Sequence, residues 1–359
     1  MIRVLVVDDS PLMQRILRDV LSRDPEILVT ACLGSGEEAL AFLGKQPVDV
    51  ITMDISMPGM DGFTATRKIM ESPHPTPVII ISSQWEPREV EKTFRAMDAG
   101  AVAILPKPEK DLFEKDEQLF PIFRIVKSAA LTKVKRLRPR LDPLQKKDPR
   151  EKAAPSSGTF SEPSEDTLKK RFPNIKSVVV GASTGGPQAL TEFLSHLPGT
   201  FSCPLLVVQH ISKGFDSGLA EWLGKNSPLS VKLAEEREIP RGGTVYLAPS
   251  GVHLGMNPEG ALIFSKDPPE HGVRPAASWL FRTAAKIYGG DLGAVLFSGM
   301  GRDGALELRY LRDLGALTFA QSRETSVVWG MPGEAVRLNA PEYVGSPAFI
   351  ARILGKLLR

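Results

Sequence analysis

The sequence has little cysteine, little net charge and no long apolar run. Its two cysteines, Cys32 and Cys203, lie far apart and outside any CxxC spacing, which disfavours a disulfide scaffold and a thiolate metal site. The formal net charge of +3 gives no electrostatic case for nucleic acid or membrane as a partner. The apolar run after Met1 is too short for a signal peptide or a membrane span, and no other run reaches spanning length. We therefore expect a cytoplasmic protein with no nucleic-acid partner and no membrane insertion.

The chain also lacks coiled-coil heptads, internal repeats and helix-turn-helix spacing, which disfavours the DNA-binding outputs built on such helices. Its composition, 24% charged and 42% hydrophobic, is that of a globular protein, and 359 residues suit two domains. A stretch rich in Lys, Arg, Pro and Ser separates two α/β patterns and is typical of a solvated tether. We place the first domain at residues 1–125, the linker at 126–172 and the second domain at 173–359.

The first domain alternates short β-branched stretches with amphipathic segments. The expected strands are Arg3–Val7, Leu28–Ala31, Val48–Met53, Val78–Ile81 and Ala101–Leu105. The expected helices include Leu12–Leu21, Arg88–Asp98 and a final one within Leu112–Leu131. Five such βα units predict a flavodoxin-like parallel sheet covered by helices on both faces.

Acidic side chains follow two of these strands. Asp8 and Asp9 end the first strand and Asp54 ends the third, and the carboxyl ends of parallel strands share one crevice. Three carboxylates there suit a hard cation such as Mg²⁺ beside a phosphate. Ser82 after the fourth strand can donate a hydroxyl, and Lys107 after the fifth supplies a positive charge. A single aspartate would be interpreted as a cap or turn residue, but five matching groups make that reading improbable.

The first domain thus resembles the receiver domain of bacterial two-component response regulators. The resemblance is carried by Asp8-Asp9-Ser10, Asp54–Gly62, Ser82 and Lys107-Pro108. It implies that Asp54 accepts a phosphoryl group from a histidine kinase, and that Ser82 and Lys107 report the new charge. It also implies a Mg²⁺ cofactor held by Asp8, Asp9, Asp54 and the backbone carbonyl of Ser56. Ile104 stands where many receivers carry an aromatic residue, so aromatic gating is not expected.

The second domain carries a second α/β pattern and a candidate nucleophile. Its expected strands are Ser177–Val180, Pro204–Gln209, Thr244–Ala248, Ala261–Phe264, Gly293–Phe297 and Thr318–Gln321. Ser183 follows the first of them in Gly181-x-Ser183-x-Gly185, which fits the nucleophile-elbow pattern. A phosphate-binding loop or a plain turn would fit the same spacing.

A serine nucleophile needs a base and an orienting acid. His210 ends the next strand, and Asp303 lies in the turn after Gly293–Phe297, so both reach the edge where Ser183 stands. A histidine at a strand end is often structural, and Asp303 could instead cap the helix Ala305–Arg312. The order serine, histidine, aspartate also differs from that of α/β-hydrolases, which disfavours that fold.

Together these residues resemble the catalytic domain of the protein-glutamate methylesterases of bacterial chemotaxis, the CheB family. The motifs that carry the resemblance are Gly181–Gly186, Gln209-His210, Ala248–His253, Ser298–Gly304 and Gly330–Ala335. It implies a doubly wound α/β domain that hydrolyses glutamate methyl esters on the cytoplasmic helices of methylated chemoreceptors. Deamidation of glutamines there, and sensory adaptation as the outcome, are implied as well.

The same resemblance implies roles for particular residues. Ser183 is expected to be the nucleophile, His210 the base and Asp303 the orienting acid, with no cofactor for this reaction. Thr184 and the backbone near Met300 are expected to hold the oxyanion. The segment Arg274–Ser278, expected to face the substrate, departs from the family's common Arg-Pro-Ser-x-Asp.

Two other classes of function remain open. The second domain could bind receptors as a non-catalytic, phosphorylation-dependent adaptor. A nucleotide-binding enzyme could use Gly181–Gly186 as a phosphate loop, although Gln209-His210 stands where an acidic residue would then be expected. If the protein is an esterase, the linked architecture suggests that the unphosphorylated receiver covers the catalytic crevice.

Overall fold

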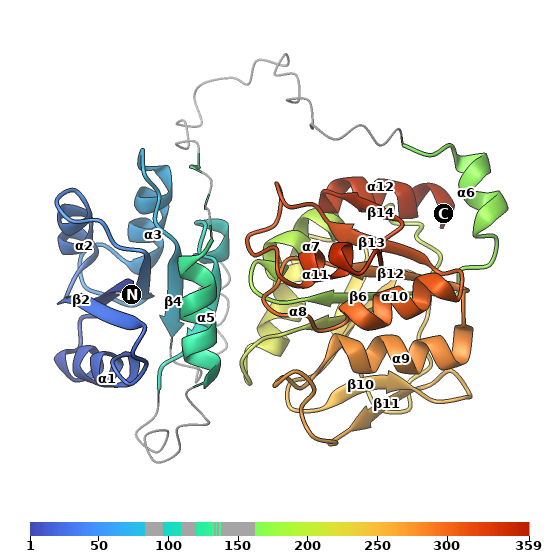
Figure 1. The fold of residues 1–359 in the computed structure, drawn as a ribbon, viewed down its shortest axis with the longest axis horizontal. Helices are drawn as coiled ribbons and strands as arrows, with labels where there is room; N and C mark the ends of the chain where they lie inside the picture. Colours follow the sequence, from blue (N-terminus) through green and yellow to red (C-terminus); the bar gives the residue numbers. More distant parts are fainter. Residues whose placement is uncertain (83–95, 109–119, 133, 135, 138–161, 359) are drawn as a thin grey trace.

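The structure is a computed structural model that describes residues 1–82, 96–108, 120–132, 134, 136–137 and 162–358. Two α/β domains lie side by side, and α5 of the first faces the second (Figure 1). In the part of the chain that is described, no helix has the length and apolar character needed to cross a membrane.

The first domain is a five-stranded parallel sheet in the order β2-β1-β3-β4-β5. Its strands are β1 (Ile2–Val7), β2 (Ile27–Leu33), β3 (Val50–Asp54), β4 (Val78–Ser82) and β5 (Ala103–Pro106). Its helices are α1 (Pro11–Leu21), α2 (Gly36–Leu43), α3 (Gly62–Glu71) and α5 (Phe120–Ala130). This is the order of flavodoxin-like folds, as predicted.

All five predicted strands of this sheet are present, with bounds that differ by at most two residues at either end. The central strands β3 and β4 are buried along their whole length, which explains why their sequences are mostly apolar. The predicted helix Arg88–Asp98 lies outside the described residues except for 96–98, which are helical. The described part of the final helix begins at Phe120.

The second domain is built on a seven-stranded parallel sheet in the order β14-β13-β12-β6-β7-β9-β8. Its strands are β6 (Ser177–Ala182), β7 (Leu205–Gln209), β8 (Ser230–Leu233), β9 (Thr244–Leu247), β12 (Leu292–Leu296), β13 (Leu317–Gln321) and β14 (Tyr343–Gly345). A separate antiparallel pair is formed by β10 (His253–Met256) and β11 (Leu262–Ser265). The helices are α6 (Glu165–Arg171), α7 (Gly186–Ser195), α8 (Asp216–Lys225), α9 (Ala277–Tyr288), α10 (Ala305–Asp313), α11 (Met331–Arg337) and α12 (Pro347–Leu357).

The expected doubly wound architecture is confirmed, with differences at the sheet edges. The predicted strand Ala261–Phe264 belongs to the β10–β11 pair and not to the main sheet. The edge strands β8 and β14 were not predicted, because both are short and neither contains a fully buried residue. They therefore lack the continuous apolar run from which the central strands can be predicted.

Both ends of the predicted linker carry helix. α5 continues past residue 125 to Ala130. α6 begins after Ser164, whose hydroxyl accepts the backbone N–H of Thr167 at 3.2 Å, and its Leu168 is fully buried in the core of the second domain. α6 packs on α12, so the second domain includes residues before the boundary placed at 173. Residues 138–161 lie outside the described part of the chain.

The two domains meet along β5 and α5 of the first and the loops at one edge of the second. The Gln188 side-chain amide at the start of α7 donates to the backbone oxygen of Ala101 at 2.6 Å. Val327 packs against the apolar cluster of the first domain. A cavity of about 520 Å³ lies between the domains, lined by Ile104, Arg124 and Pro108 on one side and by Ser183 and His210 on the other.

Candidate active site

Ser183 stands in a tight loop between β6 and α7. Its N–H donates to the carbonyl oxygen of Ser298 at 2.9 Å, and its own carbonyl accepts the N–H of Gly186 at 2.7 Å. Gly185 has φ 76°, a conformation that favours glycine, and a Cβ at Gly186 would lie 2.0 Å from the Gln209 side-chain oxygen. Every hydrogen bond that Ser183 makes within the described chain uses its backbone, which leaves Oγ available for chemistry.

His210 and Asp303 come from the strands on either side of β6. β7 and β12 both pair with β6, so the residues after these three central strands share one sheet edge. His210 Nε2 lies 2.8 Å from Asp303 Oδ2. His210 and Ser183 both line the interdomain cavity. The structure thus brings together the three residues that the sequence placed at one edge, and leaves Nδ1 as the ring nitrogen not bound to Asp303.

The surroundings of Asp303 keep it ionised. The residue is 2% exposed, and its carboxylate also accepts the backbone N–H groups of Ala277 at 2.6 Å and Ser278 at 2.9 Å. Burial by itself would raise the pKa of Asp303, but the hydrogen bond and charge of His210 and the N–H of Ser278 outweigh it and hold the pKa at about 2. Because the carboxylate is ionised, His210 Nε2 carries the proton and Nδ1 is the basic nitrogen.

Asp303 does not cap the helix that follows it. The N-cap of α10 is Gly304, with φ 76° and no side-chain hydrogen bond. The Asp303 carboxylate instead receives the first N–H groups of α9, a helix that comes earlier in the chain. The capping alternative on Ala305–Arg312 is therefore wrong, because the turn aims the side chain away from its own helix.

The backbone beside Ser183 offers hydrogen-bond donors. Within the described chain the N–H groups of Thr184, Gly185 and Met300 have no acceptor, and Thr184 and Met300 line the cavity with Ser183. A Cβ at Gly299 would lie 2.7 Å from Ser183 Cβ, so the loop after β12, which carries Gly299 and Met300, packs directly against Ser183. These N–H groups lie in the two loops that meet at Ser183 and are available as donors to a ligand in the cavity.

The segment Arg274–Ser278 is only partly exposed to a substrate. Arg274 lines the cavity, whereas Ala276 and Ser278 are fully buried. The Ser278 hydroxyl donates to the Glu307 carboxylate at 2.7 Å and accepts the N–H of Gly304 at 2.9 Å. The expectation that the whole segment faces the substrate is wrong, because its second half forms the wall behind Asp303.

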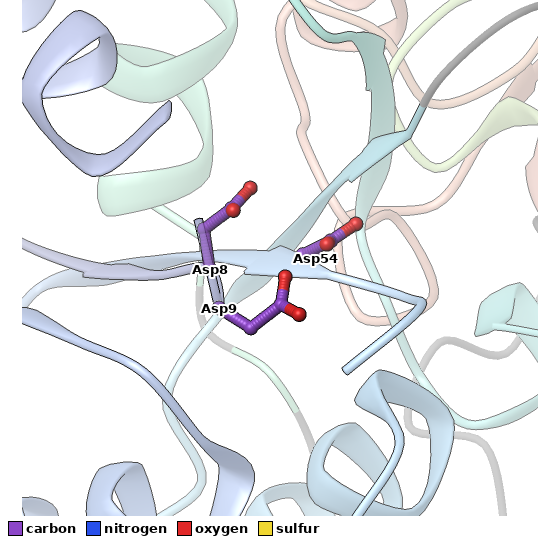
Figure 2. A group of neighbouring side chains, drawn as sticks. All are labelled: Asp8, Asp9 and Asp54. Atoms are coloured by element: carbon purple, nitrogen blue, oxygen red, sulfur yellow. The ribbon is translucent and has the colours of Figure 1, made fainter. Parts of the chain in front are cut away.

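The predicted phosphoryl site is assembled at the edge of the first sheet. Asp8, Asp9 and Asp54 project from the ends of β1 and β3, and one carboxylate oxygen of each lies within 4.8 Å of the others (Figure 2). Lys107 Nζ lies 3.0 Å from Asp8 Oδ2 and 2.9 Å from Asp54 Oδ2. Ser82 is buried at the end of β4, and its carbonyl accepts the N–H of Lys107 at 2.9 Å.

Charge and burial oppose each other in this acidic site. Burial raises the pKa of Asp54, Lys107 opposes that rise, and Asp8 adds to it, with a raised pKa as the result. Burial would lower the pKa of Lys107, but Asp54 and Asp8 reverse the effect. A compact set of three carboxylates with a single lysine fits a divalent cation, which would offset their mutual repulsion. Ser56 is exposed next to this set, on the loop after Asp54.

Several residues around both sites were not singled out from the sequence. Gln209 donates from its side chain to the carbonyl oxygens of Ser183 and His210, both at 2.9 Å, and so links the loops that carry these two residues. The Ser298 hydroxyl donates to the Thr184 carbonyl at 2.7 Å. Both residues belong to motifs noted in the sequence, but Arg124, from the other domain, carried no signal that could have found it.

The fold and the two sites define a class of protein: a response-regulator receiver joined to an α/β output domain with a Ser-His-Asp constellation. Two family models match the chain, "CheB methylesterase" at residues 178–354 and "Response regulator receiver domain" at residues 4–115. Taken with the relatives below, these matches show that the chain belongs to the CheB methylesterase family.

Relatives match over almost the whole length. A protein of Syntrophus aciditrophicus named "Protein-glutamate methylesterase/protein-glutamine glutaminase 1" is 45% identical and covers 99% of this chain and 98% of its own. A protein of Nitrosospira multiformis with the corresponding name is 44% identical over 100% of this chain and 97% of its own. The solved catalytic domain of Thermotoga maritima CheB methylesterase is 38% identical, covers 50% of this chain and 97% of its own, and has a TM-score of 0.49.

Proposed function

We propose that this protein is a phosphorylation-regulated protein-glutamate methylesterase that also deamidates glutamines on methylated chemoreceptors in the cytoplasm. Sensory adaptation would be the outcome. The observation that carries the proposal is the meeting of Ser183, His210 and an ionised Asp303 at the carboxyl edge of three adjacent strands. The names of the full-length relatives support the same activity.

In the proposed reaction His210 Nδ1 takes the proton of Ser183 Oγ as that oxygen attacks the γ-carbonyl of the glutamyl ester. Asp303 stabilises the imidazolium that forms. The free N–H groups of Thr184, Gly185 and Met300 bind the tetrahedral oxyanion, each donor contributing about 3–4 kcal/mol by analogy with measured oxyanion holes. His210 returns the proton to the leaving methanol.

The second half of the reaction uses the same groups. Water attacks the glutamyl ester of Ser183, His210 takes its proton, and the glutamate carboxylate is released as Oγ regains a proton. With a glutamine substrate the first leaving group is ammonia instead of methanol. A non-catalytic adaptor could use Asp303 to hold the start of α9, but it would not need His210 beside that carboxylate and Ser183 in one cavity.

The activity is tested by methanol release from a methylated chemoreceptor fragment with the full chain and a small-molecule phosphodonor. We expect enzyme-dependent release of methanol, and release of ammonia from a fragment that carries glutamine at the same position. Failure to release either product from protein that has been phosphorylated would contradict the proposed function.

Regulation would begin at Asp54, with a histidine kinase as the phosphodonor in the cell. Mg²⁺ held by Asp8, Asp9 and Asp54, together with the backbone carbonyl of Ser56, would neutralise charge during phosphoryl transfer. Lys107 already contacts Asp54, so a phosphoryl group on Asp54 would form an ion pair with the Lys107 ammonium group. β5 leads from this lysine back to Ala101, which Gln188 contacts at the domain interface.

Asp54→Asn is expected to remove the stimulation of methanol release by a phosphodonor while leaving the unstimulated rate unchanged, because the acceptor carboxylate is lost at a distance from the triad. Phosphoryl incorporation with acetyl phosphate and Mg²⁺ should fall to background, and chelation of Mg²⁺ should do the same to the wild type. Asp19→Asn, on the exposed surface of α1, is the matched control and should incorporate phosphoryl normally. Normal stimulation of Asp54→Asn would refute this assignment.

A further inference from the structure

Arg124 of the receiver domain reaches the candidate active site of the other domain. It lies on α5, is half-buried, and lines the interdomain cavity together with Ser183, His210 and Met300. Within the described chain its guanidinium donates no hydrogen bond and forms no ion pair. Burial lowers the pKa of Arg124, and the charge of Asp303 opposes that effect. The arginine is therefore held beside the catalytic pair without a partner of its own.

The other charged groups of the cavity have the same sign as Arg124. Lys213, from the loop after β7, and Arg274, from the loop before α9, line it as well. Among the described lining residues none carries a carboxylate. Asp303, which lies behind His210, supplies the nearby negative charge. The charged groups around His210 are thus the Asp303 carboxylate, which contacts it, and three cations that line the same cavity, one of which belongs to the receiver.

A cation at this position opposes the chemistry of the base. During the reaction His210 becomes positively charged, and that charge is stabilised by Asp303. A half-buried guanidinium nearby repels the imidazolium. It also interacts with the negative charge of Asp303, which then stabilises the imidazolium less. Both effects are strong because water is partly excluded from the cavity. Movement of the receiver away from the cavity would remove this charge together with the cover.

We propose that Arg124 is an electrostatic inhibitor that the receiver inserts beside the His210–Asp303 pair, so that the closed protein has a weakened base as well as a covered site. This inference rests on the proposed function, since it requires Ser183 and His210 to act as nucleophile and base. It differs from simple cover because it depends on the charge of one side chain. Arg124 acts through His210 and does not contact the reacting atoms.

The test uses a substrate small enough to enter without domain opening. A cavity of about 520 Å³ is of the size that holds small organic ligands, so p-nitrophenyl acetate can report on the base in the unphosphorylated full chain. Arg124→Gln is expected to raise its hydrolysis about three- to tenfold, the range expected for removal of one nearby charge from a partly desolvated pair. The acid limb of the pH–rate profile should move to higher pH, because the imidazolium is no longer repelled.

Three further proteins make the result specific. Arg124→Lys keeps the charge and should behave as the wild type. Lys127→Gln, on the same helix, removes a cation that pairs with Asp24 and Glu26 inside the receiver and should leave both rate and pH profile unchanged. Ser183→Ala should be inactive, and its full activity would overturn the proposed function itself.

Two outcomes overturn the inference while leaving the proposed function intact. An unchanged or lower rate in Arg124→Gln, with Ser183→Ala inactive, would show that the guanidinium does not oppose the base. A higher rate accompanied by the larger radius of gyration of the phosphorylated protein in X-ray scattering would show that Arg124 acts only as a contact between the domains. The proposal requires a faster reaction, a shifted acid limb and an unchanged radius.

Discussion

Ser183→Ala is expected to lower the rate of methanol release by about 10⁴- to 10⁶-fold, the loss seen when a catalytic serine is removed. The substitution deletes Oγ, the atom that forms the covalent bond, and disturbs little else. The loop is held by the backbone bonds of Ser183 to Ser298 and Gly186 and by the Gln209 side chain, none of which uses the hydroxyl. Methanol release under saturating phosphodonor measures the effect.

Phosphorylation of the receiver domain serves as an internal control for this variant. Ser183→Ala should still accept a phosphoryl group on Asp54 and should unfold at the temperature of the wild type within error, which separates loss of chemistry from loss of structure. Ser195→Ala, on the exposed end of α7, is a matched replacement that should keep full activity. Retention of even a tenth of the wild-type rate by Ser183→Ala would exclude Ser183 as the nucleophile.

Asp303→Asn is expected to lower the rate by about 10⁴-fold, as for the corresponding change in a serine-histidine-aspartate triad. The amide has nearly the size of the carboxylate. With its NH₂ turned toward His210, its oxygen still accepts the N–H of Ser278, whereas the N–H of Ala277, which bonds the same Oδ2 as His210, loses its acceptor. The NH₂ group, however, favours the tautomer of His210 that carries its proton on Nδ1. The nitrogen that should take the serine proton would then already hold one.

The pH–rate profile gives this prediction a second readout. A carboxyl group with a pKa of about 2 is ionised throughout the range in which activity is measured, so the wild-type acid limb contains no contribution from Asp303. A carboxyl pKa held below its usual value adds stability that is present above pH 4 and is lost as the pH falls through about 2. Asp303→Asn should lose that contribution and, at neutral pH, unfold at a lower temperature than the wild type.

Asp313→Asn is the matched control for Asp303→Asn. It removes a carboxylate from the other end of α10, where the side chain is 54% exposed and paired with Arg309. Activity and acid stability should both remain at the wild-type level. A loss smaller than tenfold in Asp303→Asn would mean that His210 is oriented by other groups.

The sheet edge explains why the candidate site could be predicted from the sequence. In a parallel sheet all strands run in the same direction, so three separate motifs that each follow a strand must lie at the same edge of the sheet. The sequence could not show that the three strands carrying these motifs are neighbours in the sheet. It depends on the strand order, in which β6 lies between β7 and β12 although β12 comes much later in the chain. The acidic set Asp8, Asp9 and Asp54 was predictable on the same ground.

The errors have physical causes too. Asp303 precedes a helix, so a capping role was reasonable, but the glycine that follows has φ 76° and turns the chain so that the carboxylate reaches α9. Ala276 and Ser278 belong to the segment expected to face the substrate, and only the packing of α9 against the Asp303 turn shows that they are buried. The position of Arg124 depends on how two domains dock, which periodicity within either domain does not encode.

In the proposed reaction the substrate ester forms a covalent bond to Ser183, and the unphosphorylated receiver slows that step. Labelling of the full chain with a methyl fluorophosphonate, followed by peptide mass spectrometry, tests it directly. We expect one adduct per chain, on Ser183, which forms faster once Asp54 is phosphorylated and is absent from Ser183→Ala. An adduct on another residue, or equal labelling of Ser183→Ala, would contradict it.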